Sequence, residues 1–360
     1  MDAPEGEKCR TSRLNVFQSA CQSDMCTNSL RFLGHPTPTM SRFVGIVLAL
    51  AAFAVAAPPL SVRQSITTLS TAQISAFRPY TFYASAGYCT SASTLTWNCG
   101  VPCAANPTFK PVASGGDGTV IQFWFVGYDP TLETVIVSHQ GTDPEHILPL
   151  LTDANFILEP LNPLLFPGLS PSVLVHSGFA DEHAATATDV LAAVKNATTR
   201  FGATKVTMVG HSLGGALSLI ESVYLPLHVT GVTFQTILYG LPRVGNQEFA
   251  DLASAGNTVT HINNMEDPIP ILPPTSSLPL ESFHHPTGEI HIQARDSGDW
   301  DSCPGEYSHG IQIVLSLNIS IAGEDNISPL CSTGDVTVTN GNLTNHDGPY
   351  DGVEMGNGCV

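Results

Sequence analysis

The sequence predicts an α/β fold with a mainly parallel central sheet flanked by helices. Runs rich in β-branched and aromatic residues recur along the chain, and helical patterns lie between several of them. This alternation is typical of a parallel sheet covered by helices. A second observation is Gly210-His211-Ser212-Leu213-Gly214, which joins a strand-like run to a helical one. Ligands of such sheets bind beyond the carboxyl ends of the strands, where Ser212 would lie.

The expected elements follow from residue type and spacing. Alanine and aromatic residues at helical spacing predict a first helix, and runs of Val, Ile, Thr and aromatic residues bounded by turn residues predict the strands. In chain order we expect a helix over 71–88, strands over 121–128 and 133–138, a helix over 179–200, a strand over 205–209, a helix over 215–224, and strands over 233–239 and 258–262. No repeat or convincing linker interrupts residues 57–360, so we expect one domain there.

Residues 40–56 have the pattern of a secretory signal. Met40 and a following arginine precede an apolar run that ends in Ala-Val-Ala, which predicts cleavage after Ala56. A membrane anchor would need about 20 apolar residues, and this run is shorter and ends at Pro58. Residues 1–39 are polar and aperiodic, so they are a doubtful upstream leader with Met40 as the working start. The mature protein is expected to be secreted and extracellular.

Composition narrows the class of partner. The chain has 31 acidic and 13 basic residues and a net charge of −18, which disfavours nucleic acid and anionic membranes. With 42% hydrophobic residues it can bury a large core. We therefore expect a protein that binds no nucleic acid and does not insert stably into a membrane. We also expect a monomer.

Cysteines and glycosylation sequons also fit export. Six cysteines follow the expected signal, an even number that predicts disulfides without fixing their pairing. Zinc binding by Cys99 and Cys103 is the alternative, but no partner pair with ligand spacing lies near them. We expect no metal and no cofactor. Asn-X-Ser/Thr sequons occur at Asn196, Asn318, Asn326 and Asn342.

The Gly210–Gly214 segment predicts a nucleophilic serine. Glycines on both sides allow strand and helix to approach closely, so that the Ser212 hydroxyl is exposed at a strained corner. The same pattern also occurs by chance in glycine-rich loops. The flanking strand and helix favour acyl transfer by Ser212 over that alternative.

Ser212 would need a base, a carboxylate and donors for an oxyanion. Asp267 is the preferred carboxylate, because it follows a strand-like run and precedes a proline. Glu266 is the local alternative. Asp267 could also belong to an ordinary Asp-Pro turn with no catalytic role. His346 follows both, in the order Ser, Asp, His expected for a hydrolase of this architecture. Order alone also admits three other histidines: His285, His291 and His309.

The oxyanion donors are expected at the end of another strand. The run over 133–138 breaks at Gly141, so the backbone N–H and hydroxyl of Thr142 could join the N–H of Leu213, the residue after the nucleophile. The alternative is a plain Gly-Thr turn.

These motifs together resemble the secreted fungal lipases of the lipase class 3 family and their feruloyl esterase relatives. The resemblance covers residues 71–359 and depends on three segments. They are GHSLGGAL at 210–217, PRVGN at 242–246 and NNMEDPIPILPP at 263–274. It implies an α/β-hydrolase fold, Asp267 as the triad acid, and His346 as the base. Residues 285–289 resemble the segment that follows the acid in that family and are expected to be structural.

Two further points come with the resemblance. It implies three disulfides: Cys89 with Cys359, Cys99 with Cys103, and Cys303 with Cys331. One departure is Gln140, where the family usually has arginine before the Gly-Thr pair. This departure puts in doubt a stabilising role for an arginine at this position. It does not affect the backbone N–H donor of Thr142.

The expected lid segment follows the expected oxyanion strand. In similar lipases a short helix covers the serine at this position, which here would include Ile147, Leu148, Leu150 and Leu151. The alternative is that the apolar residues from 156 to 166 are core. The apolar character favours a triacylglycerol lipase acting on lipid esters at an oil–water interface. A feruloyl or aryl esterase is the first alternative, and a non-catalytic extracellular binding protein is the second.

Overall fold

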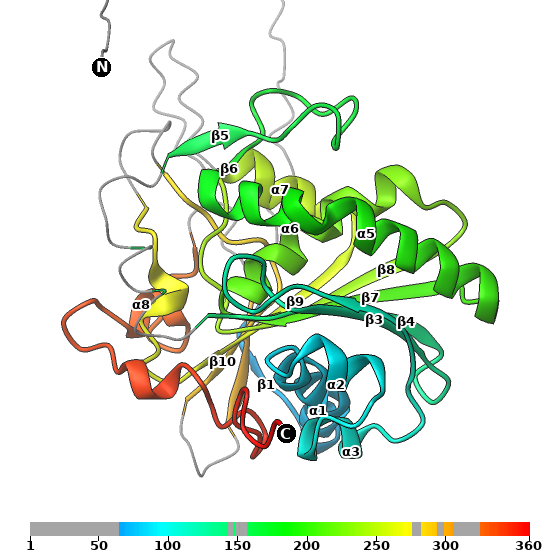
Figure 1. The fold of residues 1–360 in the computed structure, drawn as a ribbon. Coiled ribbons are helices and arrows are strands. Elements are labelled where there is room, and N and C mark those ends of the chain that lie inside the picture. Colours follow the sequence, from blue (N-terminus) through cyan, green and yellow to red (C-terminus); the bar gives the residue numbers. More distant parts are fainter. Residues whose placement is uncertain are drawn as a thin grey trace, which may run out of the picture. The chain divides into compact units, whose positions relative to one another are not determined.

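The computed structural model places a nine-stranded mixed sheet at the centre of the fold (Figure 1). The structure describes residues 65–142, 147, 151, 157–275, 282–293, 299–304 and 325–360. Residues 61–360 form one compact unit. The expected signal and upstream leader lie outside the described residues.

The strand order is β1-β11-β10-β9-β8-β7-β4-β3-β2. The bounds are β1 Thr67–Thr68, β2 Lys110–Gly115, β3 Trp124–Asp129, β4 Thr134–His139, β7 Lys205–His211, β8 Thr233–Tyr239, β9 Thr258–Asn264, β10 Glu289–Ile292 and β11 Trp300–Cys303. Neighbouring strands from β4 to β10 run parallel, and the strands at both edges pair antiparallel. A separate hairpin pairs β5 (Leu158–Pro160) with β6 (Leu174–His176).

Helices cover both faces of the sheet (Figure 1). One face packs against α1 (Thr71–Ala86), α2 (Ser91–Leu95) and α3 (Val101–Ala105). The other packs against α5 (Ser177–Phe201), α6 (Leu213–His228) and α7 (Gln247–Gly256). The mainly parallel sheet flanked by helices is the predicted architecture, and the expected strands and helices are present with ends shifted by a few residues.

Burial on both faces explains why the central strands are apolar at successive positions. In β4, Val135 and Val137 belong to the core under α5 and α6, and Ile136 belongs to the core under α1. Successive strand residues point to opposite faces, so a sheet covered on both sides needs apolar residues at every position.

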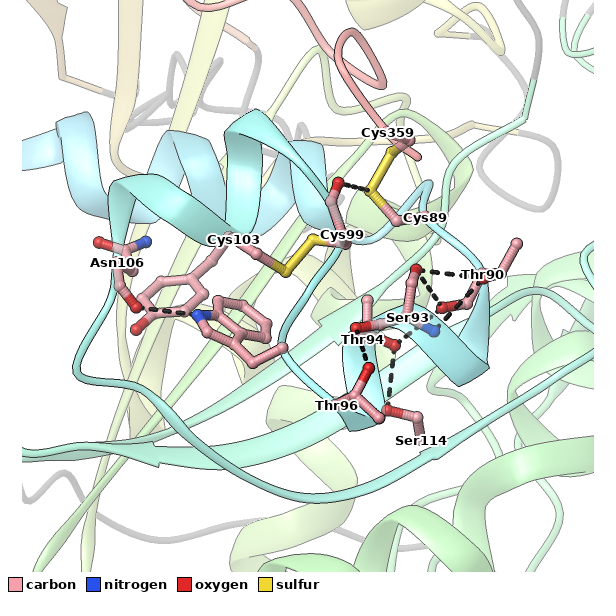
Figure 2. Close-up of a disulfide and its surroundings, with 12 residues drawn as sticks. Cys89, Thr90, Ser93, Thr94, Thr96, Cys99, Cys103, Asn106, Ser114 and Cys359 are labelled. Atoms are coloured by element: carbon pink, nitrogen blue, oxygen red, sulfur yellow. Dashed lines mark hydrogen bonds between the residues drawn. A yellow bond between two sulfur atoms is a disulfide. The ribbon is translucent and has the colours of Figure 1, made fainter.

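The described cysteines form three disulfides, and their pairing is the one implied by the resemblance. Figure 2 shows Cys89 bonded to Cys359 and Cys99 bonded to Cys103, which lie close together beside α2 and α3. The third joins Cys303 to Cys331. The Cys89–Cys359 bond links the end of α1 to the C-terminal segment, 270 residues away along the chain.

The parallel strands bring their carboxyl ends to one edge of the sheet. Ser212 follows β7, Gly240 follows β8, and Asp267 comes three residues after β9. Gly141 follows β4, the other neighbour of β7. The fold therefore gathers the expected catalytic segments at the edge where sheets of this class bind ligands.

Candidate active site

Ser212 occupies a tight corner between β7 and α6. Its backbone has φ 58° and ψ −128°, a conformation that costs a non-glycine residue on the order of 1–3 kcal/mol. A Cβ atom on Gly210 would lie 2.2 Å from the Gly214 carbonyl oxygen, so only glycine fits there. The Ser212 N–H donates to the Tyr239 carbonyl oxygen at 3.0 Å, which ties the corner to β8.

The helix after the serine favours negative charge beside it. Ser212 is the N-cap of α6, and Leu213 is the first helical residue. The first N–H groups of a helix have no partner within the helix, and the helix dipole adds partial positive charge there. An oxyanion formed at Ser212 would therefore lie at a site suited to it.

Asp267 and His346 form a buried pair. Asp267 Oδ2 lies 2.8 Å from His346 Nδ1, and both side chains are fully buried. Asp267 Oδ1 accepts a hydrogen bond from the Ile269 N–H at 2.9 Å, so both carboxylate oxygens are used. An ionised carboxylate can only accept, so Nδ1 carries the proton and Nε2 of a neutral ring is left as an acceptor.

The His346 ring lies beside the nucleophile corner. A Cβ on Gly240 would lie 2.9 Å from His346 Cε1, so glycine after β8 makes room for the ring. The His211 and His346 rings are 4.4 Å apart between centroids. Among the described residues, neither Ser212 Oγ nor His346 Nε2 has a hydrogen-bond partner, although both atoms are buried. No direct hydrogen bond therefore joins the hydroxyl to the imidazole; such bonds are often loose before substrate binds.

The alternative histidines have other partners. His285 Nε2 lies 2.6 Å from the Pro270 carbonyl oxygen. His291 Nε2 lies 2.9 Å from the Met265 carbonyl oxygen. Both therefore contact the backbone of the acid loop, which we define as residues 264–273. His309 lies outside the described residues.

Glu266 contacts the segment that carries His346 rather than the His346 ring. Its Oε2 accepts a hydrogen bond from Asn345 Nδ2 at 2.8 Å, and its carbonyl oxygen accepts one from the Asn342 N–H at 2.7 Å. Asn264 Nδ2 adds a bond to the Asn345 carbonyl oxygen at 2.8 Å. The acid loop is therefore tied to residues 342–346, the base turn, at several points besides the carboxylate.

The expected oxyanion segment lies against the first turn of α6. A Cβ on Gly214 would lie 2.2 Å from the His139 carbonyl oxygen, and one on Gly141 would lie 2.5 Å from the His211 carbonyl oxygen. Leu213 precedes Gly214 in the chain and Thr142 follows Gly141, so each residue is next to one of these close contacts. Gln140 accepts a hydrogen bond from the Phe123 N–H at 2.8 Å through Oε1, so it extends the β3–β4 pairing.

Only part of the expected lid is described. Ile147 and Leu151 are helical, fully buried, and part of the core on the α5 and α6 face. Leu148 and Leu150 lie outside the described residues. No helix in the described ranges is long and apolar enough to span a bilayer.

Sequence reasoning missed a positioning network around His211. Its Nε2 lies 2.8 Å from the His346 carbonyl oxygen, which can only accept, so Nε2 carries the proton. Its Nδ1 then accepts from the Tyr88 hydroxyl at 2.6 Å. Burial, with the neighbouring His346, holds the pKa of His211 well below 6.5, so the ring stays neutral. Tyr350 Oη donates to the same carbonyl at 2.9 Å.

Arg243 was also missed, although it belongs to a motif that the sequence singled out. Its Nε lies 2.5 Å from Asp325 Oδ2, and both side chains are buried. Its guanidinium also donates to the carbonyl oxygens of Ile271 and Pro273. The Arg243 N–H donates to the Leu272 carbonyl oxygen at 2.8 Å. Arg243 thereby holds the end of the acid loop.

One grouping of potential metal ligands occurs in the described part of the chain. Glu289, Cys303 and Cys331 lie close together, but the two sulfur atoms are joined in a disulfide and offer no thiolate.

Comparison with known proteins gives a consistent result. The model of the lipase (class 3) family matches residues 136–277. A secreted mono- and diacylglycerol lipase of Fusarium solani is 30% identical over 244 residues, which cover 63% of this chain and 69% of that lipase. A secreted mono- and diacylglycerol lipase of Malassezia globosa is 30% identical over 206 residues, 56% of this chain and 66% of its own length. The chain thus spans about two thirds of such relatives.

Solved structures share the fold. The Lip2 lipase of Yarrowia lipolytica matches with a TM-score of 0.67 at 18% identity and covers 83% of this chain and 99% of its own. Lipase II from Rhizopus niveus matches with a TM-score of 0.64 at 23% identity, over 81% of this chain and 99% of its own. These matches confirm the predicted α/β-hydrolase fold.

Proposed function

Because the chain belongs to the lipase class 3 family, we propose that it is a secreted serine carboxylester hydrolase that cleaves acylglycerols. Ser212 is the nucleophile, His346 the base and Asp267 the acid. One observation carries this proposal: the buried Asp267–His346 pair leaves an imidazole nitrogen without a partner, and the His346 ring packs on His211, the residue before the unpartnered serine hydroxyl.

The proposed reaction uses these residues as a serine hydrolase does. His346 Nε2 takes the proton of Ser212 Oγ as Oγ attacks the ester carbonyl carbon. Negative charge develops on the carbonyl oxygen and is stabilised by the N–H groups of Leu213 and Thr142; each such donor contributes about 3 kcal/mol. His346 then protonates the leaving alcohol. Water, deprotonated by the same nitrogen, releases the fatty acid. Asp267 holds the productive tautomer and stabilises the imidazolium.

Access to the serine requires a movement. Ser212 and His346 are both 0% exposed, so an ester cannot reach them without one. We assign this movement to the lid segment that includes Ile147, Leu148, Leu150 and Leu151. Apolar area exposed in water costs roughly 25 cal/mol per Å² and is recovered at an oil surface, so opening is favoured at an interface. The burial of Ile147 and Leu151 is consistent with two interpretations: a closed lid over Ser212, or a segment that is a fixed part of the core.

Triacylglycerols are the first candidate substrates in this proposal, as expected from the apolar segment after Thr142. Mono- and diacylglycerols are the second candidate, because relatives about 30% identical in sequence are named for them. Export through residues 40–56 completes the proposal and agrees with the secretion of those relatives. N-terminal sequencing of the secreted protein should begin at Ala57.

The experiment combines covalent labelling with a substrate series. A phosphonate ester should label wild-type protein on Ser212 and leave Ser212→Ala unlabelled. Rates are then measured on emulsified triacylglycerol, diacylglycerol, monoacylglycerol and methyl ferulate. Absence of labelling in folded protein, with and without detergent, would leave only the binding-protein alternative. Faster cleavage of methyl ferulate would assign an aryl esterase, and cleavage of partial glycerides alone would assign the second candidate.

A further inference from the structure

The described sequons differ in whether the asparagine amide is available. Asn196, Asn326 and Asn342 lie within the described residues, and Asn318 lies outside them. Attachment of a glycan uses the amide nitrogen Nδ2 and needs open space beside it, whereas the carbonyl oxygen Oδ1 stays an acceptor. The positions of these two atoms therefore decide which sequons the folded protein accommodates.

Asn326 has both ends of its amide engaged. Its Nδ2 donates to the Pro304 carbonyl oxygen at 2.7 Å, and its Oδ1 accepts from the Ser328 N–H at 3.0 Å. The residue is only 7% exposed and follows Asp325, the buried partner of Arg243. A sugar on Nδ2 would need space that the packed segment does not offer.

Asn342 has the opposite arrangement. The residue is exposed and caps the short helix η3 (Leu343–Asn345) at the start of the base turn. The cap uses only Oδ1, which accepts from the Thr344 hydroxyl at 2.7 Å and the Thr344 N–H at 3.2 Å. A glycan on Nδ2 would leave both of these bonds in place.

Asn196 is exposed in the middle of α5. The hydroxyl of its sequon, on Thr198, donates to the Val194 carbonyl oxygen at 2.9 Å and so turns back onto the helix. At Asn342, by contrast, the sequon hydroxyl contacts the asparagine side chain directly.

We propose that Asn342 carries an N-linked glycan on the base turn and that Asn326 is left unmodified. The inference rests on the export proposed above. The co-reactant is a lipid-linked oligosaccharyl diphosphate of the secretory pathway. Its anomeric C1–O bond breaks, a C1–N bond forms to Asn342 Nδ2, Nδ2 loses one proton, and the lipid diphosphate leaves with the electron pair. The glycan is then attached four residues before the catalytic His346.

The test is peptide mapping of protein secreted from yeast. The host's secretion leader is placed ahead of the full chain, so that entry into the pathway does not depend on residues 40–56. Glycan removal by a peptide N-glycosidase in heavy-oxygen water marks each occupied asparagine as labelled aspartate. We expect the label at Asn342 and not at Asn326. A bare Asn342 in secreted protein, or a label at Asn326, would overturn the proposal.

Matched variants check the assignment by gel mobility. Asn342→Asp keeps an acceptor for Thr344 and should lose one glycan step, which is the decrease in gel mobility caused by one attached glycan. Thr344→Ser keeps the sequon and should retain that step. Ser328→Ala destroys the Asn326 sequon without changing the Asn326 amide and should lose no step. Circular dichroism of each secreted variant confirms folding. Hydrolysis is not measured in these assays, so failure of the proposed enzymatic activity would leave their result unaffected.

Discussion

The Nε2 atom of His211 lies 2.8 Å from the carbonyl oxygen of His346, which links the residue before Ser212 to the backbone of the proposed base. Tyr350 Oη donates to the same oxygen at 2.9 Å. The His211 bond thus holds the base turn against the end of β7, and the Tyr350 bond fixes the same carbonyl group within the C-terminal segment. The position of the His346 ring relative to Ser212 depends on this link as well as on Asp267.

We predict that His211→Phe lowers kcat about 10- to 100-fold with little change in KM. It removes one donor to the His346 carbonyl oxygen, and displacement of a catalytic group by about 1 Å costs on the order of 100-fold. The measurement is steady-state hydrolysis of a soluble p-nitrophenyl ester. His211→Gln supplies an amide N–H donor and should recover part of the rate. An unchanged kcat in folded His211→Phe would contradict a positioning role.

Substitution of the two adjacent carboxylates should separate their roles. Asp267→Asn should lower kcat about 10⁴-fold, because an amide in this position favours the wrong imidazole tautomer. Glu266→Gln should stay within a few-fold of wild type, since its side-chain oxygen can still accept from Asn345 Nδ2. The assay is the same ester hydrolysis, with thermal unfolding as the control for folding. The reverse ranking would assign Glu266 as the triad acid.

Much of the fold was predictable because it depends on local patterns. Two-sided burial makes the central strands apolar, and the nucleophile corner needs glycine at 210 and 214. Asp267 and His346 could be chosen by their order along the chain and by motif resemblance, but 79 residues separate them.

Contacts between distant segments leave weaker signals. The Arg243–Asp325 pair spans 82 residues, and the Tyr88–His211 contact spans 123. These polar side chains are buried or half-buried only because several distant segments pack together. Arginine in the PRVGN motif and histidine in the serine motif were the available signals, but residue type alone names no partner.

Acid should destabilise the folded chain through its buried histidines. Burial lowers the pKa of His139 to about 3, of His176 to about 4 and of His285 to about 3, from 6.5. Below pH 6.5 the unfolded chain therefore binds protons that the folded chain does not. The stability that these neutral histidines contribute is fully present above pH 6.5. Below it, the free energy of unfolding falls as the pH drops towards 4, by about 1 kcal/mol per pH unit for each histidine.

Urea unfolding at about pH 7.5 and about pH 5 measures this effect. The free energy of unfolding should be lower at the acidic pH. His285→Gln keeps a donor for the Pro270 carbonyl oxygen and should reduce the difference. Asp325 affects stability in another pH range. Burial opposes ionisation of its carboxyl group, but the charge of Arg243 outweighs burial and lowers the pKa. The stability that the ionised carboxylate contributes is therefore lost only below about pH 4. Equal stability at both pH values would contradict the prediction.

Arg243 should contribute separately to stability and to catalysis. Arg243→Met leaves the Asp325 carboxylate buried without its partner, which should lower the free energy of unfolding by about 3–5 kcal/mol. It also removes the guanidinium bonds to the acid loop carbonyl oxygens of Ile271 and Pro273. Because Asp267 is in the same loop, we expect kcat to fall about 10-fold or more through its displacement.

A double variant separates these two effects. Arg243→Met with Asp325→Leu removes both charges, and replacement of a buried ion pair by apolar residues is often neutral for stability. The double variant should therefore regain most of the free energy of unfolding in urea titrations. Its kcat should stay low, since the acid loop still lacks the guanidinium donors. Recovery of kcat together with stability would show that Arg243 acts only through the charge balance, and that the acid loop positions Asp267 without it.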